Sequence, residues 1–358
     1  MPVDSGLGRR LQLIQGLHWL YGANGDPYAT LLRGFDDDLR PVHEELRRRG
    51  VLWPAKTGTW VTASHAVGGE LLGHPGLGTR AARNGPAVQR IMTWDQDLTT
   101  GDAGPLPGAD LVRQACAEAF GRLGGAFDLA EVAHRVPVEV LARVHGLTAA
   151  QREKLVPLCA DVTIALDSLL CPQRLEPVGR LLDALDGLRA LLGEGSPALP
   201  HAVLGVRLSA DLFTGAVSAL LETPGEWAKL QATPRRAEAI VRETLRYRPP
   251  VHIHTAFALA DLDVAGQAIP AGGQVAVVLS AANRDPAVFP EPDRFDPDRA
   301  GTPALATGSW LPLARLHAET ALIALAARFP RMRADGSPSR RGRAPVTRGL
   351  LRLPVRAD

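Results

Sequence analysis

The chain has 358 residues, a formal net charge of +2, and a composition that is 46% hydrophobic but only 5% aromatic, so leucine, alanine and valine must form most of the core. The basic residues are scattered among acidic ones, which excludes the charged stripe of a nucleic-acid-binding protein. Cys116, Cys159 and Cys171 lack paired or C-x-x-C spacing, which excludes a disulfide framework and a structural zinc site and predicts a cytoplasmic protein.

A first helix is predicted near the N-terminus, before the segment GANGDP ends it. Its residues form one broad apolar face at helical spacing, made by Leu7, Leu11, Ile14 and His18 with Leu13, Leu17 and Tyr21 beside them. The pair Arg9-Arg10 precedes this apolar run, but polar residues interrupt the run and no cleavage site follows, so we predict no export signal. No uncharged apolar run is long enough to span a bilayer, and no membrane association is expected.

The rest of the chain predicts a mainly α protein with small β-sheets. A second helix is expected from about 38 to 49, followed by two short extended runs in VLWPAKTGTWVTAS. Residues 111 to 245 show helical patterns almost throughout, with brief Gly and Pro breaks. After Pro249-Pro250 come short strands around IPAGG, an irregular Pro- and Asp-rich meander, a last helix over 313–328 and closing extended segments. Without a repeat or a long linker, residues 1–358 are predicted to form one domain.

One charged pair stands out near the end of the long helical region. Glu243 and Arg246 are three residues apart and therefore share one face of a helix that Pro249 ends. Together with YRPPV and the later AANRDPAVFPEPDRF, this spacing predicts a buried bidentate ion pair with Arg294 as its third member. The expected role is structural, namely to lock the helix to the meander.

These residues resemble the cytochrome P-450 family of thiolate-haem monooxygenases. The segments GTWVTAS, ETLRYRPPV, IPAGGQVAVVLSAANRDP, FPEPDRFDP, LARLHAE and RGLLRLPV occur in the family's order and extend over nearly the whole chain. The resemblance implies the family's fold, a mostly helical triangular prism with small sheets.

The residues that carry the family's chemistry are missing. Counting back from the LAR segment, the haem-ligating cysteine is replaced by Gly308, and the loop that leads to it is shortened. The propionate-binding arginine corresponds to Ala256, and the proton-delivering acid and threonine correspond to Arg207 and Leu208. We therefore expect no haem and no other cofactor, no catalytic residue, and a shortened loop whose Trp310 partly fills the old haem space.

The opening GLGRRLQLIQGLHWLYGANGDPYATLLRGFDDD resembles a cysteine-less branch of this family. Members of that branch are auxiliary partners of glycosyltransferases in macrolide and anthracycline biosynthesis, of the type that serves the erythromycin desosaminyltransferase. The resemblance implies a non-catalytic protein that binds and allosterically activates a GT-B glycosyltransferase using a TDP-deoxysugar, in a hetero-oligomer. Residues 1–37 are the candidate partner-binding segment, and the predicted contacts are Leu13, Leu17, Trp19, Leu20 and Tyr21.

Other interpretations stay open. The chain could be an enzyme, either a haem protein with an unusual ligand such as His252 or a haem-free isomerase or dehydratase, and it could be a small-molecule carrier. His252 and His254 alternate on a probable strand, but no third metal ligand is evident. Cys159 and Cys171 lie in apolar helical surroundings, where thiols pack as small hydrophobes. The run RRGRAPVTR is predicted to be a solvated hairpin and not a binding patch.

Overall fold

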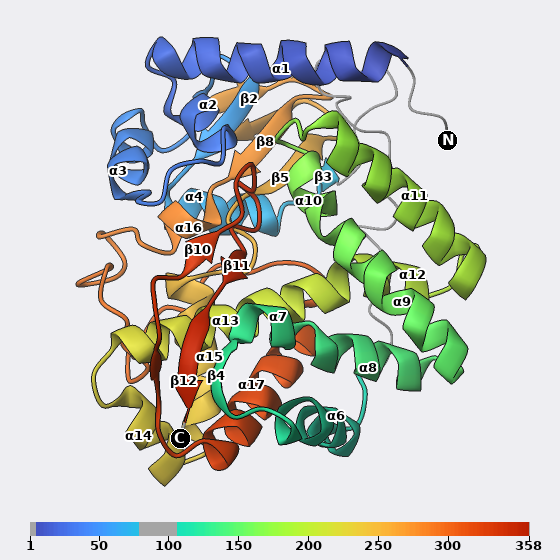
Figure 1. Ribbon diagram of the computed structural model, residues 1–358. Helices are drawn as coiled ribbons and strands as arrows, with labels where there is room; N and C mark the ends of the chain where they lie inside the picture. The colour runs from blue at the N-terminus through green and yellow to red at the C-terminus, as the bar shows by residue number, and fades with distance from the viewer. Residues whose placement is uncertain (1–4, 79–105, 358) are drawn as a thin grey trace.

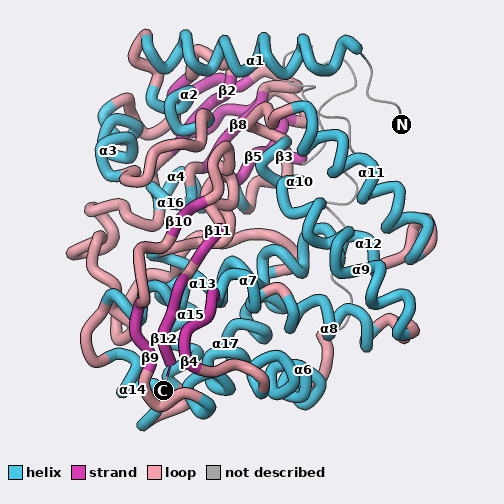
Figure 2. Tube along the Cα trace, viewed as in Figure 1, coloured by secondary structure: helices cyan, strands magenta, loops and turns pink. Residues whose placement is uncertain are grey.

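The protein is described by a computed structural model that covers residues 5–78 and 106–357 (Figure 1). Helices dominate this part of the chain and the strands form small sheets, as Figure 2 shows. The predicted mainly α class is therefore confirmed. One hydrophobic cluster includes both Leu7 and Ala357, so the two ends of the described chain share a core.

The first helix, α1 (Ser5–Ala23), lies along the upper edge of the molecule in Figure 1 and packs against α2 (Pro27–Leu32) and α11 (Leu175–Leu192). The broad apolar face predicted for it is buried only in part: Leu7, Leu11, Ile14 and His18 are buried, whereas Leu13 is exposed and Leu17 and Tyr21 are half-buried. Sequence periodicity missed α2 because six residues are too few to show it. Asp26 is the N-cap of this helix, and its Oδ1 accepts a hydrogen bond from the Ala29 amide at 2.9 Å.

The main sheet lies beneath α1 and joins distant parts of the chain. Its strand order is β1-β2-β8-β5-β3, and only β2 and β8 run parallel. The helix α3 (Arg40–Arg48), which begins two residues later than expected, lies near its edge in Figure 1. The strands of this sheet are β1 (Trp53–Pro54), β2 (Thr59–Thr62), β3 (Leu77–Gly78), β5 (His254–Ala258) and β8 (Gln274–Val277). A separate two-stranded sheet pairs β6 (Leu262–Val264) with β7 (Gln267–Ile269).

The body of the molecule consists of helices around α13 (Val206–Glu222). A π-helical turn, His201–Gly205, precedes α13, and the whole span Ala198–Glu222 is long and apolar enough to cross a membrane. Because 94% of its most apolar window is buried inside the protein, this span is the core helix of the fold. The other helices in this part of the described chain are α4 (His65–Leu72), α6 (Ala109–Gly121), α7 (Leu129–Ala133), α8 (Arg135–Val144), α9 (Ala149–Asp161), α10 (Ala165–Ser168), α12 (Ala198–Pro200), α14 (Glu226–Ala232), α15 (Arg236–Tyr247) and α16 (Leu279–Ala282).

The C-terminal part closes the structure over this body. The last helix, α17 (Leu311–Arg328), packs against α13, α6 and α15. The strand β12 (Pro354–Ala357) lies between β4 (Gly125–Asp128) and β9 (Met332–Ala334), so a segment near residue 126 pairs with the end of the chain. The strands β10 (Ser339–Arg340) and β11 (Leu350–Arg352) form a hairpin. The prediction that this hairpin is solvated is wrong, since residues 344–350 are all buried.

Candidate functional site

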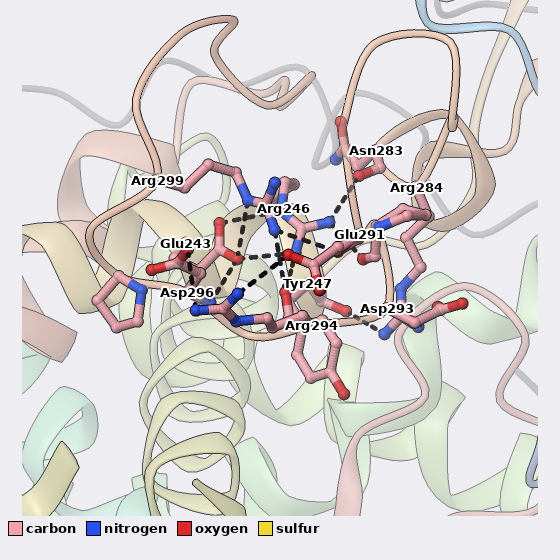
Figure 3. Close-up of polar contacts among 12 residues, drawn as sticks. Glu243, Arg246, Tyr247, Asn283, Arg284, Glu291, Asp293, Arg294, Asp296 and Arg299 are labelled. Carbon is pink, nitrogen blue, oxygen red and sulfur yellow. Dashed lines mark hydrogen bonds and ion pairs between the residues drawn. The ribbon is translucent and has the colours of Figure 1, made fainter. Parts of the chain in front are cut away.

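The ion pair predicted in α15 forms as expected (Figure 3). Arg246 donates two hydrogen bonds to the Glu243 carboxylate, from Nε at 2.9 Å and from Nη2 at 2.7 Å. Both side chains are almost fully buried. Arg246 also donates to three carbonyl oxygens outside α15, those of Asn283, Pro292 and Arg294. The guanidinium therefore fastens the end of α15 to the meander, which is a structural arrangement.

The third member of this network is Arg299 and not Arg294. The Arg299 Nε lies 3.5 Å from the Glu243 Oε1, and its guanidinium is 14% exposed (Figure 3). Arg294 contributes only its carbonyl oxygen, while its guanidinium is 60% exposed and pairs with Glu291 at 3.0 Å. The two arginines are five residues apart in a segment without regular period, so no sequence pattern indicated which of them would return to α15. The prediction for Arg294 is corrected accordingly.

The loop that should carry the metal ligand is held by Trp310. Gly308, at the predicted ligand position, has a φ of +107°, and it offers no side chain. Trp310 is 2% exposed, and its ring lies tilted against that of His201 in the π-helical turn, with 5.4 Å between the ring centroids. A methyl group added at Gly205 would lie 2.7 Å from the His201 ring and 2.8 Å from the Trp310 ring. Trp310 thus packs directly against the backbone of the central helix, and only glycine leaves room for it at position 205.

Arg207 and Leu208, where the family carries its acid and threonine, have different surroundings. The Arg207 Nε lies 2.5 Å from the Asp211 carboxylate, and its Nη2 donates to the Thr347 hydroxyl at 3.3 Å. Asp167 in turn accepts hydrogen bonds from the backbone and the hydroxyl of Thr347. This buried network ties α13 to the C-terminal hairpin and places a cation where an acid would be needed.

The residues around this loop do not fit a thiolate-bound haem. Leu208 lines a cavity of about 20 Å³ between α13 and the loop, together with Leu245, Ala306 and Ala314. That volume holds about one water molecule. Ala256 lies buried in β5 and offers no charge for a propionate. The three cysteines are free and buried elsewhere in the body, and burial raises the pKa of each thiol to about 12.

The two alternating histidines do not form a metal site with any other ligand. Among residues 5–78 and 106–357, no group of three His, Cys, Asp or Glu side chains is placed to hold a metal ion. His252 lines a cleft beside several arginines and does not line the small cavity near Gly308. His254 lies in β5 opposite Val277, and burial lowers its pKa below the usual value.

The predicted partner contacts lie on the outward side of α1. Leu13, Trp19 and Leu20 are 64%, 47% and 55% exposed, whereas Leu17 and Tyr21 are half-buried. Leu13, Leu17 and Leu20 recur at helical spacing, so α1 carries a second apolar face opposite the buried one. Sequence analysis missed one neighbour of this surface. Phe35, 52% exposed, lies 6.3 Å from the Trp19 ring.

Comparison with known proteins agrees with this architecture. The family model for cytochrome P-450 matches residues 231–300. The chain is 36% identical to protein AknT of Streptomyces galilaeus, covering 98% of this chain and 96% of AknT. It is 35% identical to EryCII of Saccharopolyspora erythraea, named a cytochrome P-450 family protein, covering 98% of each chain. The chain belongs to the cytochrome P-450 family. The predicted fold and family resemblance are thereby confirmed.

Two further comparisons show how the likeness is distributed within the family. Protein DesVIII of Streptomyces venezuelae is 39% identical over 98% of this chain and 94% of its own length, whereas 6-deoxyerythronolide B hydroxylase is 31% identical over 69% of this chain and 70% of its own length. The solved structure of Mycobacterium smegmatis CYP164A2 superposes with a TM-score of 0.74 at 27% identity, covering 92% of this chain and 99% of that one. The fold is thus shared with CYP164A2, and the sequence similarity to AknT, DesVIII and EryCII extends over nearly the full chain.

Proposed function

We propose that the protein is a haem-free, non-catalytic auxiliary protein that binds and allosterically activates a TDP-deoxysugar glycosyltransferase of macrolide- or anthracycline-type antibiotic biosynthesis. The observation that carries the proposal is the second apolar face of α1. A helix that is apolar on two sides and buried on only one has a surface suited to a partner. The full-length similarity to AknT, DesVIII and EryCII, which includes this helix, supports the same interpretation.

Activation needs no chemistry from the auxiliary protein. If it binds the competent state of the transferase more tightly than the incompetent state, it shifts the population toward the competent state by that difference in affinity. A coupling free energy of about 1 to 3 kcal/mol is typical and corresponds to a 5- to 150-fold change in affinity. The three buried free thiols support a cytoplasmic complex of the two proteins.

The proposed interface is tested by Leu20→Ser, with Val156→Ser on α9 as the matched control. Leu20 and Val156 are both apolar residues on helices, and they are 55% and 56% exposed, respectively. Neither substitution is therefore expected to affect folding. Each protein is co-expressed with the glycosyltransferase encoded beside its gene, and co-purification and transferase activity are measured. We expect Leu20→Ser to weaken the complex about tenfold, because burying a leucine side chain contributes about 1.5–3 kcal/mol. Val156→Ser should bind as the wild type does.

Two outcomes would contradict this proposal. A transferase whose activity and purification are unchanged by the wild-type protein would refute the auxiliary function itself. A transferase that is activated equally by the wild-type protein, Leu20→Ser and Val156→Ser would leave the function intact but remove α1 from the interface.

The haem-free state is tested by spectroscopy of the purified protein after expression with added haem precursor. With glycine at position 308 and Trp310 packed on Gly205, we expect no stoichiometric Soret band. A control with Gly308→Cys shows whether restoring the thiolate is enough. We expect the band to stay absent, because the cavity beside this loop has room for about one water. A stoichiometric Soret band in the wild type would support the rival interpretation as a haem enzyme.

A further inference from the structure

A polar cleft of about 390 Å³ lies on the side of the molecule where the segment before α3 meets α16 and the C-terminal hairpin. Figure 1 shows α3, α16 and β10 near one another at this side. The cleft contains more basic than acidic side chains. Its arginines are Arg40, Arg248, Arg284, Arg340 and Arg348, and its acids are Asp37, Asp38 and Asp293.

Three of these arginines have carboxylate partners. Arg40 pairs with Asp38 at 2.7 Å, and Arg284 pairs with Asp293 at 2.6 Å. Arg248 forms an ion pair with Glu222, which lies outside the cleft. Their charges are therefore balanced without any ligand.

Arg340 and Arg348 are different. Within the described ranges, 5–78 and 106–357, neither guanidinium has a carboxylate at ion-pair distance. Arg340 donates to the Arg348 carbonyl at 2.9 Å, and Arg348 donates to the carbonyls of Asp36 and Asp37 at 2.6 and 3.1 Å. Carbonyl oxygens solvate a guanidinium but do not neutralise it. Asp36 and Asp37 act on Arg348, and Glu222 and Asp37 act on Arg340, only from beyond ion-pair distance, so the two neighbouring cations have no carboxylate in direct contact.

The surroundings of these two side chains make the imbalance costly. Arg348 is only 7% exposed. Burial and the adjacent Arg340 lower the pKa of Arg348 to about 10, and burial together with Arg248 lowers the pKa of Arg340. Buried charges in proteins are normally paired, because removing an ion from water without a counter-charge is unfavourable. An anion bound between the two guanidinium groups would supply that counter-charge.

We propose that this cleft binds a phosphate-type oxyanion through Arg340 and Arg348. Two guanidinium groups match the charge of a phosphate dianion, and each presents a planar fork of N–H donors suited to phosphate oxygens. His252 adds a third potential contact, since it lines the cleft and its buried Nδ1 has no hydrogen-bond partner among the described residues. None of the α1 residues proposed as partner contacts lines the cleft, so the site is independent of the proposed transferase interface.

The test is isothermal titration calorimetry of the full-length protein with inorganic pyrophosphate, inorganic phosphate and acetate at constant ionic strength. Wild type is compared with Arg340→Gln and with Arg180→Gln, which removes an equally basic side chain from α11. Arg180 is 51% exposed and paired with Glu176. We expect pyrophosphate or phosphate to bind the wild type and Arg180→Gln with Kd below about 1 mM. Arg340→Gln should bind at least tenfold more weakly, since the substitution removes one of the two guanidinium groups that bind the oxyanion.

The results of these titrations distinguish a diphosphate ligand from a single phosphoryl group, and some of them would refute the proposal. Tighter binding of pyrophosphate indicates a diphosphate ligand, and equal binding of phosphate indicates a single phosphoryl group. No binding of either at 10 mM, equal binding by Arg340→Gln and wild type, or acetate binding as tight as phosphate would each overturn the proposal. If Arg340→Gln does not fold, as judged by circular dichroism, Arg348→Gln is titrated in its place and the same tenfold loss is required.

Discussion

Replacing Arg246 with methionine is expected to lower the free energy of unfolding by about 3 to 5 kcal/mol, which is a large share of the stability of an ordinary domain. The reason is that Glu243, 4% exposed at its side chain, would keep a buried negative charge without its bidentate partner. Three carbonyl oxygens of the meander would lose their donor in the same step. Urea denaturation followed by circular dichroism measures the loss.

Arg294→Met is the matched control for this experiment. Arg294 lies in the same meander, but its guanidinium pairs with Glu291 and not with Glu243. Its guanidinium is 60% exposed, and an exposed ion pair contributes at most about 1 kcal/mol. A double variant, Glu243→Gln with Arg246→Met, should recover part of the loss because no unpaired charge remains. Equal destabilisation by Arg246→Met and Arg294→Met would show that the assignment of Arg299 as the third member is wrong.

The second large effect is a loss of folding stability in mildly acidic solution. Burial lowers the pKa of His43, His201 and His317 to about 3 and that of His18 to about 4. Because these values lie below the ordinary value near 6.5, the unfolded chain binds more protons than the folded protein below that pH. The stability that the neutral imidazoles contribute is therefore complete above pH 6.5 and is lost as the pH falls. Between pH 7.5 and 5.5, each such histidine should cost about 1.4 kcal/mol.

Urea midpoints measured from pH 8 to pH 5 test this prediction, and His317→Leu isolates one contribution. Both ring nitrogens of His317 are buried without a hydrogen-bond partner in the described structure, so leucine is expected to be tolerated at this position. The variant should lose less stability than the wild type over the same interval, by about 1.4 kcal/mol. A flat stability profile of the wild type between pH 7.5 and 5.5 would contradict the burial of neutral imidazoles.

Local patterns in the sequence were enough to predict several elements and their roles. The three-residue spacing of Glu243 and Arg246 identified their ion pair. That pair depends on contacts within one helix turn, where the geometry is the same in any protein. Helical spacing also identified an apolar face of α1, but which part of it is buried depends on the packing against α2 and α11. The residues at 256 and 308 were equally readable, since alanine has no side-chain cation for a propionate and glycine has no side-chain thiolate for a haem iron in any fold.

Longer-range contacts could not be predicted in the same way. The choice of Arg299 over Arg294 depends on how the meander turns back toward α15. The burial of the C-terminal hairpin depends on α13, since Arg207 reaches Thr347 across 140 residues of sequence. The arginine cleft exists only because the segment before α3, the end of α15 and the hairpin meet in space.

The sequence alone thus determined the mainly α class, the family and the absence of a cysteine at position 308, because each follows from residue identity or from spacing within a single element. Only the tertiary structure decided which arginines are neutralised and which histidines are kept from protonation. Burial and charge pairing depend on which segments folding brings together, and the spacing of residues along the chain does not indicate this.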